Sequence, residues 1–253
     1  MNDNGLYSPE WFKKQKMGSS TSAEIIVPIV MDFISPKSVV DVGCGVGTWL
    51  ESFTKKGVND VLGIDGSWID ESQLRIPKKL FKMTDISKPF ATGRKADLAI
   101  SLEVGEHLAD SSAQGLVKSL TDTAPVVLFS AAIPSQPGTG HVNGQWPEYW
   151  AAHFKKYGYM PIDCIRRRVW TNPNVEYWYA QNAIMYVRES GLSAYPKLVR
   201  EAECGYSQPL PLVHPRRYYY ALQPLPSIPF RAVRKVKHLA RKLMPKSARK
   251  RQA

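Results

Sequence analysis

The stretch that decides the fold of this chain is Val39-Val40-Asp41-Val42-Gly43-Cys44-Gly45-Val46-Gly47-Thr48-Trp49. A short β-branched run ends near an acidic residue, three glycines follow at alternate positions, and a helix-length segment begins near Thr48. Alternate glycines allow a tight turn and let a ligand approach the bare main chain, while the first amides of the next helix point at that ligand. The stretch therefore predicts a strand, a ligand-binding turn and a helix.

The details of this turn disfavour a dinucleotide. In the fingerprint GxGxxG the sixth position is glycine, and here it is Thr48. The carboxylate of Asp41 would repel a pyrophosphate, but it suits a ligand that carries an ammonium or sulfonium group. A second acid, Asp65, ends the next predicted strand, where a carboxylate can bind both hydroxyls of a ribose. Together the two acids indicate a ligand with a positive charge and a ribose.

Short β-branched runs alternate with helix-length segments over the first 190 residues. This alternation predicts an α/β fold, with a parallel sheet that has helices on both faces. The runs typical of strands lie at 38–42, 58–64, 80–83, 97–102, 125–129, 160–165 and 183–187, and the helix-length segments include 22–33, 48–56, 111–123 and 148–157.

The glycine motif, with Asp65 closing the next strand, resembles the cofactor site of class I S-adenosylmethionine-dependent methyltransferases. The resemblance covers roughly residues 20–188, and it implies a Rossmann-like, seven-stranded, mostly parallel sheet that binds S-adenosylmethionine. It also implies that the glycines line the methionine and ribose, Asp65 binds the ribose, residues 85 and 86 meet the adenine, and Glu103 lies beside the reacting methyl group. The cofactor-binding candidates are therefore Asp41, Gly43, Gly45, Gly47, Asp65, Asp85, Ile86 and Glu103. For Asp85, a helix N-cap before Ser87 is the alternative.

Acid–base candidates follow the fourth predicted strand. Glu103, Glu106 and His107 have the spacing ExxEH, which resembles a segment of ubiquinone-biosynthesis O-methyltransferases and small-RNA 2′-O-methyltransferases. In those enzymes the segment can hold a divalent metal that coordinates the acceptor oxygen. Glu103, Glu106 and His107 are thus metal candidates here, although we favour structural roles or cofactor contacts for them over a metal.

The loop after the fifth predicted strand offers another base. His141 has a pKa suited to a general base for a hydroxyl, and Asn143 and Gln145 could recognise sugar hydroxyls. The alternative is that His141 and Asn143 only tie the loop to itself. The stretch 134–187 is similar to O-methyltransferases associated with bacterial glycan assembly, and its aromatic rings could stack on sugar faces. The catalytic candidates are therefore His141, His107 and Glu106.

The net charge of +12 lies at one end of the chain. Residues 204–253 include 12 basic residues and no Asp or Glu, whereas residues 1–203 carry 22 residues of each sign. Prolines and tyrosines at 207–229 predict an extended stretch, and 230–244 predict a helix with one apolar and one basic face. Such helices are typical of anionic membrane surfaces. Docking on the protein's own core is the alternative, and nucleic acid is disfavoured because the catalytic part is neutral.

The sequence predicts four parts: an N-terminal lid at 1–19, a methyltransferase domain at 20–190, a Pro/Tyr-rich connector at 191–229 and a basic amphipathic tail at 230–253. Three scattered cysteines and no signal peptide or apolar span indicate a cytoplasmic protein, peripheral at the inner face of the membrane. The expected activity is O-methylation of a sugar or glycan-type hydroxyl. The alternatives are an RNA 2′-O-methyltransferase and a non-catalytic S-adenosylmethionine-binding protein.

Overall fold

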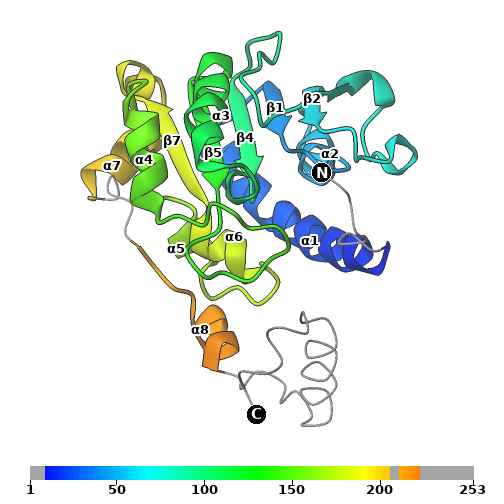
Figure 1. The fold of residues 1–253 in the computed structure, drawn as a ribbon. Coiled ribbons are helices and arrows are strands. Elements are labelled where there is room, and N and C mark those ends of the chain that lie inside the picture. The colour runs from blue at the N-terminus through cyan, green and yellow to red at the C-terminus, as the bar shows by residue number, and fades with distance from the viewer. Residues whose placement is uncertain (1–8, 206–210, 223–253) are drawn as a thin grey trace, which may run out of the picture. The chain divides into compact units, whose positions relative to one another are not determined.

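A seven-stranded sheet with the order β3-β2-β1-β4-β5-β7-β6 forms the centre of the fold (Figure 1). The computed structural model describes residues 9–205 and 211–222. Strands β1 to β5 are parallel, and β7 runs antiparallel to both β5 and β6. The strands are β1 (Ser38–Val42), β2 (Asp60–Asp65), β3 (Phe81–Met83), β4 (Leu98–Leu102), β5 (Val126–Ser130), β6 (Tyr159–Ile162) and β7 (Ile184–Arg188). The predicted Rossmann-like, mostly parallel sheet is confirmed.

The central strands are apolar at nearly every position because helices cover both faces of the sheet. Every residue of β4 and β5 is buried, as expected for parallel strands between two helical layers. Alternate residues face opposite sides: Val39 belongs to one core cluster, and its neighbour Val40 belongs to the other. The first cluster includes side chains of α1 (Pro9–Ile34) and α2 (Thr48–Lys55), and the second includes those of α3 (Asp110–Thr123) and α4 (Pro147–Lys155).

Helix α1 runs without interruption across residue 20, where the sequence placed the boundary between a lid and the domain. Its buried stripe, Ala23, Ile26, Val27 and Val30, has helical spacing and packs in the first core cluster. The Ser19 hydroxyl lies 3.0 Å from the hydroxyl of Tyr179 in α6 (Tyr177–Asn182). The residues just before the predicted domain start therefore contact its interior.

The region after β7 differs from the predicted connector. Helix α7 (Pro196–Glu203) belongs to the compact unit Met1–His214, and its Glu201 pairs with arginines of α5 (Arg166–Val169). Within the second unit, Pro215–Ala253, residues expected to be extended form α8 (Pro215–Leu222). Proline is tolerated in the first turn of a helix, where its missing N–H would have had no partner, so Pro215 begins α8 instead of preventing it.

The predicted tail, 230–253, lies outside the described residues. Among the described helices, none is both long enough and apolar enough to cross a membrane.

Candidate functional site

The glycine turn after β1 is folded in a conformation that only glycine adopts readily. Gly43, Gly45 and Gly47 have φ values of 81°, 55° and 84°, all in the left-handed region. A Cβ on Gly43 would lie 2.3 Å from Cγ2 of Val104, so the turn packs closely against the segment after β4. A Cβ on Gly45 would meet no atom within 4 Å. Gly43 therefore closes the packing, and Gly45 borders open space in which a ligand can approach the main chain.

Two buried carboxylates flank this space. Asp65 Oδ2 accepts a hydrogen bond of 2.7 Å from the amide of Gly45, and Oδ1 accepts one of 2.6 Å from the amide of Gly66. Asp41 is 3% exposed, and its Oδ2 has no hydrogen-bond partner in the described part of the chain. Burial raises the pKa of Asp41 well above its ordinary value, and the charge of Asp65 raises it further. No Lys, Arg or His among the described residues lowers the pKa of either acid, and two such buried acids favour a positively charged ligand.

Asp85 and Ile86 follow β3, and both side chains already contact other residues of the protein. The Asp85 carboxylate accepts hydrogen bonds from the amide and the hydroxyl of Ser87, and it pairs with Lys88 at 3.1 Å. These contacts form a local turn, and no helix begins after Asp85, so the N-cap alternative is wrong; the Asp85 side chain itself is exposed. Ile86 is 3% exposed and packs in the second core cluster. Contact of either residue with adenine stays a prediction.

Hydrogen bonds from other segments hold the backbone amide and both carboxylate oxygens of Glu103. Its φ is +57°, uncommon for a non-glycine residue, and its amide donates to the carbonyl and the hydroxyl of Ser130 at the end of β5. Its Oε2 accepts from Gln136 Nε2 at 2.9 Å, and its Oε1 accepts from Asn182 Nδ2 at 3.0 Å. Burial raises the pKa of Glu103 while the donors from Asn182, Ser130 and Gln136 lower it. The carboxylate therefore has one fixed orientation.

Glu106, only three residues later, has the opposite environment. It lies in the single turn η3 (Gly105–His107) and is fully buried, yet neither carboxylate oxygen has a hydrogen-bond partner among the described residues. Burial raises its pKa well above the ordinary value, and the nearby charge of Glu103 adds to the shift. A carboxylate in this state requires either a proton or a cation.

The structure groups Glu106 and His107 with His141, and the Glu106 carboxyl also interacts with that of Glu103. One ligand atom from each of Glu106, His107 and His141 lies within 4.8 Å of the other two, and the two imidazole rings are 5.0 Å apart. Both oxygens of Glu103 are taken by Gln136 and Asn182, which leaves it outside this cluster. The metal candidates named from the ExxEH spacing are therefore corrected: the third donor comes from the distant loop.

The hydrogen-bond partner of His141 fixes its tautomer. Nδ1 lies 3.0 Å from the carbonyl oxygen of Gln136, which can only accept, so Nδ1 carries the hydrogen. Nε2 then has a free lone pair, and it lies 3.9 Å from Glu106 Oε1. Burial lowers the pKa of His141, so the ring is neutral near pH 7. The cluster thus contains a neutral imidazole that can accept a proton or bind a cation.

A hollow of about 410 Å³ lies beside this imidazole. It is lined by the loop 133–144, including Gln136, Gly138 and His141. The loop is attached to η3 because the amides of Val142 and Asn143 both donate to the Glu106 carbonyl, at 2.8 and 3.0 Å. Contrary to the expected sugar contact, Asn143 is buried and accepts a hydrogen bond of 3.0 Å from Gln145. These two amides bind each other, so Asn143 ties the loop to itself, as the alternative for that residue predicted.

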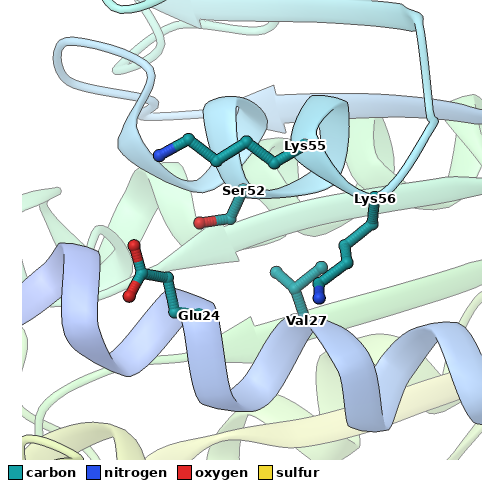
Figure 2. A pocket seen from close by; sticks show the side chains of 5 residues that line it. All are labelled: Glu24, Val27, Ser52, Lys55 and Lys56. Atoms are coloured by element: carbon teal, nitrogen blue, oxygen red, sulfur yellow. The ribbon is translucent and has the colours of Figure 1, made fainter.

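A second hollow, of about 300 Å³, lies between α1 and α2 (Figure 2). Figure 2 shows Glu24 and Val27 of α1 facing Ser52 and the lysines Lys55 and Lys56 at the end of α2. The glycine turn precedes the other end of α2, so this hollow is separate from the site.

The three consecutive arginines of α5 serve the fold. Arg166 is 1% exposed and makes two hydrogen bonds to Asp163, at 2.9 and 2.6 Å. Arg167 and Arg168 both pair with Glu201 of α7. These contacts join α5 to the preceding loop and to α7.

Sequence reasoning missed Gln136, Gln181 and Asn182, which form the buried network around Glu103. Buried amides with several partners carry no local motif. Only their proximity in the fold reveals them.

The fold and the site define a class I methyltransferase. A family model described as a methyltransferase domain matches residues 23–174, and the chain belongs to this family. It is an S-adenosylmethionine-dependent methyltransferase.

Solved structures show the same fold at low sequence identity. The chain is similar to DesVI from Streptomyces venezuelae, with a TM-score of 0.52 and 16% identity over 74% of this chain and 98% of that one. It is similar to the sugar N-methyltransferase KedS8 from Streptoalloteichus, with a TM-score of 0.54 and 16% identity over 74% and 95% of the two chains. For CalS10, an amino pentose methyltransferase from Micromonospora echinaspora, the TM-score is 0.51 and the identity 13% over 74% and 100%. No curated protein matches the sequence.

Proposed function

We propose that this enzyme transfers the methyl group of S-adenosylmethionine to a hydroxyl of a sugar-type acceptor. The observation that carries the proposal is the position of His141, whose ring lines the hollow and lies beside Glu106. A hydroxyl must lose its proton as it is methylated, so a base at the acceptor site is needed. A hollow of about 410 Å³ has the size of a small-molecule site.

The donor would occupy the space beside Gly45, because the groups around that space fit its chemistry. Each Asp65 oxygen accepts one amide N–H and Trp68 also bonds this carboxylate, which leaves acceptor capacity for a ribose hydroxyl. Asp41 offers an unpartnered buried oxygen to a positively charged group. Gly43 and Gly47 shape the turn, and Glu103 would lie beside the reacting methyl group. The alternative of a non-catalytic S-adenosylmethionine-binding protein requires the same donor site but a dispensable His141.

The chemical step uses few protein groups. The bound donor supplies a methyl group already activated on a positively charged sulfur. As the acceptor oxygen forms its bond to the methyl carbon, Nε2 of His141 accepts the hydroxyl proton, and the electron pair of the broken carbon–sulfur bond stays on sulfur. Glu106 Oε1 lies 3.9 Å from Nε2, and an ionised Glu106 would stabilise the resulting imidazolium. His107 lies next to both residues.

The same cluster also fits a divalent cation. Glu106, His107 and His141 would hold it through one carboxylate and two neutral imidazoles, a donor set suited to a first-row transition ion. The unpartnered oxygens of the buried Glu106 favour this second role. A bound cation would lower the pKa of a coordinated hydroxyl. Dialysis against EDTA separates the two roles: activity that persists assigns proton removal to His141 alone, and activity restored only by added metal assigns it to the cation.

The acceptor class is tested by product analysis. Purified enzyme is incubated with labelled S-adenosylmethionine and, separately, with nucleotide-linked hexoses, their amino-sugar analogues and an RNA oligonucleotide. We expect label on a sugar oxygen. The sugar N-methyltransferase KedS8 and the amino pentose methyltransferase CalS10 support a sugar-type acceptor, and label on the amino group would correct the methylated atom. Label on RNA, or donor binding with no turnover on any acceptor, would overturn the proposal.

We further propose that the tail at 230–253 keeps the enzyme on an anionic membrane surface, beside a membrane-assembled glycan. The basis is its sequence, in which apolar and basic residues separate onto two helical faces without any acid. Co-sedimentation with vesicles that contain anionic lipid, compared for the full chain and for a chain that ends at residue 229, tests this. Equal sedimentation of the two chains would remove the membrane role.

A further inference from the structure

A chain of buried amide groups connects the segment that leaves the catalytic unit with Glu103. The backbone N–H of His214 donates to Oε1 of Gln181 at 2.9 Å. Nε2 of Gln181 donates to Oε1 of Gln136 at 2.9 Å and to Oδ1 of Asn182 at 3.0 Å. Gln136 and Asn182 in turn donate to the two carboxylate oxygens of Glu103. Four segments that are far apart in the sequence therefore share one continuous network.

Gln181 is the member through which the outer segment reaches the carboxylate. It is fully buried at the end of α6, where its own carbonyl accepts from the Arg166 guanidinium at 3.2 Å. Its side-chain amide binds a partner on each side, so its rotamer is fixed from both directions. On the outer side, the imidazole of His214 also bonds the Trp170 carbonyl at 2.7 Å, which fixes the segment independently of Gln181.

The inner end of the network coincides with the strained residue of the site. Glu103 has a φ of +57°, a conformation that persists only when its surroundings determine it. Its two side-chain donors belong to the network, and the carbonyl of the same Gln136 also binds Nδ1 of His141. The side-chain amides therefore end at Glu103, while the main chain of Gln136 binds His141.

We propose that Gln181 is a positioning residue, which makes the orientation of the Glu103 carboxylate depend on the docking of residues 211–214. The proposal rests on the proposed function, because it assigns Glu103 to the donor site. When His214 docks, Gln181 orients Gln136 and Asn182, and these fix the carboxylate next to the methyl group. Without docking, Gln136 and Asn182 keep the bond between them but lose the orientation that Gln181 supplies, and Glu103 loses its single orientation.

The test measures affinity for S-adenosylmethionine, which needs no knowledge of the acceptor. In the full chain, Gln181→Met removes the amide at nearly constant side-chain volume. We expect calorimetry to give about 10-fold weaker donor binding, a change of the size that one hydrogen bond contributes. His214→Pro removes the N–H that reaches Gln181, and it should weaken binding to a similar extent. His214→Ala keeps that N–H and should bind the donor more tightly than His214→Pro does.

Two further variants make the result decisive. Thr92→Val removes a buried hydroxyl that bonds Thr123 outside the network, so it should lower the melting temperature without changing donor affinity. Glu103→Gln measures the contribution of the carboxylate itself. If Glu103→Gln weakens binding while folded Gln181→Met and His214→Pro bind like wild type, the positioning role is overturned and the donor site stands. If the wild type does not bind the donor, the proposed function fails first. Should Gln181→Met not fold, the comparison of His214→Pro with His214→Ala decides alone.

Discussion

The donor side and the acceptor side of the site are built in different ways. Around the glycine turn of the donor side, main-chain groups form the site: three left-handed glycines shape the turn, and amides of Gly45 and Gly66 hold Asp65, whereas Glu103 depends on the side chains of Gln136 and Asn182. On the acceptor side, side chains from separate segments surround His141 and Glu106, and their placement depends on packing. A single side-chain substitution on the acceptor side should therefore change turnover without changing donor affinity. A substitution at the end of β2 or in the glycine turn should instead weaken donor binding.

The largest expected effect is that of His141→Ala. Loss of a positioned base typically lowers turnover by about 10²- to 10⁴-fold, whereas the donor site does not include this ring. We expect turnover on the identified acceptor to fall by this amount while calorimetry gives an unchanged affinity for S-adenosylmethionine. His153→Ala, which removes a half-buried histidine of α4, is the control and should retain activity. Near-normal turnover in His141→Ala would transfer the acceptor chemistry to other residues.

Asp65→Ala should show the complementary defect. It removes the carboxyl group that would accept from the ribose hydroxyls and releases the amides of Gly45 and Gly66, so we expect donor affinity to fall by about 100-fold. Asp60→Ala lies at the other end of the same strand, where the carboxylate is exposed and pairs with Arg94, and it should bind the donor normally. Equal affinities in the two variants would mean that the donor does not use the end of β2.

Gly138→Ala sharpens the acceptor half of the comparison by moving one ring. A Cβ at this position would lie 2.0 Å from Nε2 of His141, so the imidazole must shift. Since the proton acceptor is displaced but not removed, we expect about a 10-fold loss of turnover with normal donor binding. Gly115→Ala, where a Cβ would meet no atom within 4 Å, is the matched control. If both variants have wild-type turnover, the position of Nε2 is not critical.

The same difference explains what the sequence could predict. All seven strands and the donor turn follow from local patterns, because the residues that signal each strand or turn are neighbours in the sequence. The pairing of His141 with Glu106 and His107 could not be predicted, since the loop folds back onto η3 through the Glu106 carbonyl. The ExxEH spacing suggested that Glu103 joins this cluster, but Gln136 and Asn182 bind both of its oxygens. Helix α8 was not predicted because the many prolines of this stretch suggested an extended chain, although Pro215 stands at the first position of a helix, where proline is tolerated.

The smallest expected effect lies outside both halves and measures the scaffold alone. Burial raises the pKa of Glu201, but hydrogen bonds and charges of Arg168 and Arg167 outweigh it and hold the pKa below the ordinary value of 4.5. A lowered pKa in the folded state adds stability above the unfolded pKa, and this is lost as the pH falls through the folded value. Glu201→Gln should thus lower the free energy of unfolding by about 1 kcal/mol at pH 7, and the difference from wild type should shrink below pH 4.5.

Urea unfolding at the two pH values measures this difference, and Asp32→Asn is the control because its pair with Lys197 is exposed and should contribute little. Donor affinity and turnover should stay normal in Glu201→Gln, since Glu201 pairs with Arg167 and Arg168 and not with the groups assigned to the donor or the acceptor. A pH-independent difference would show that Glu201 acts through packing instead of charge. A loss of donor affinity would show that the α5–α7 contact and the donor side are coupled.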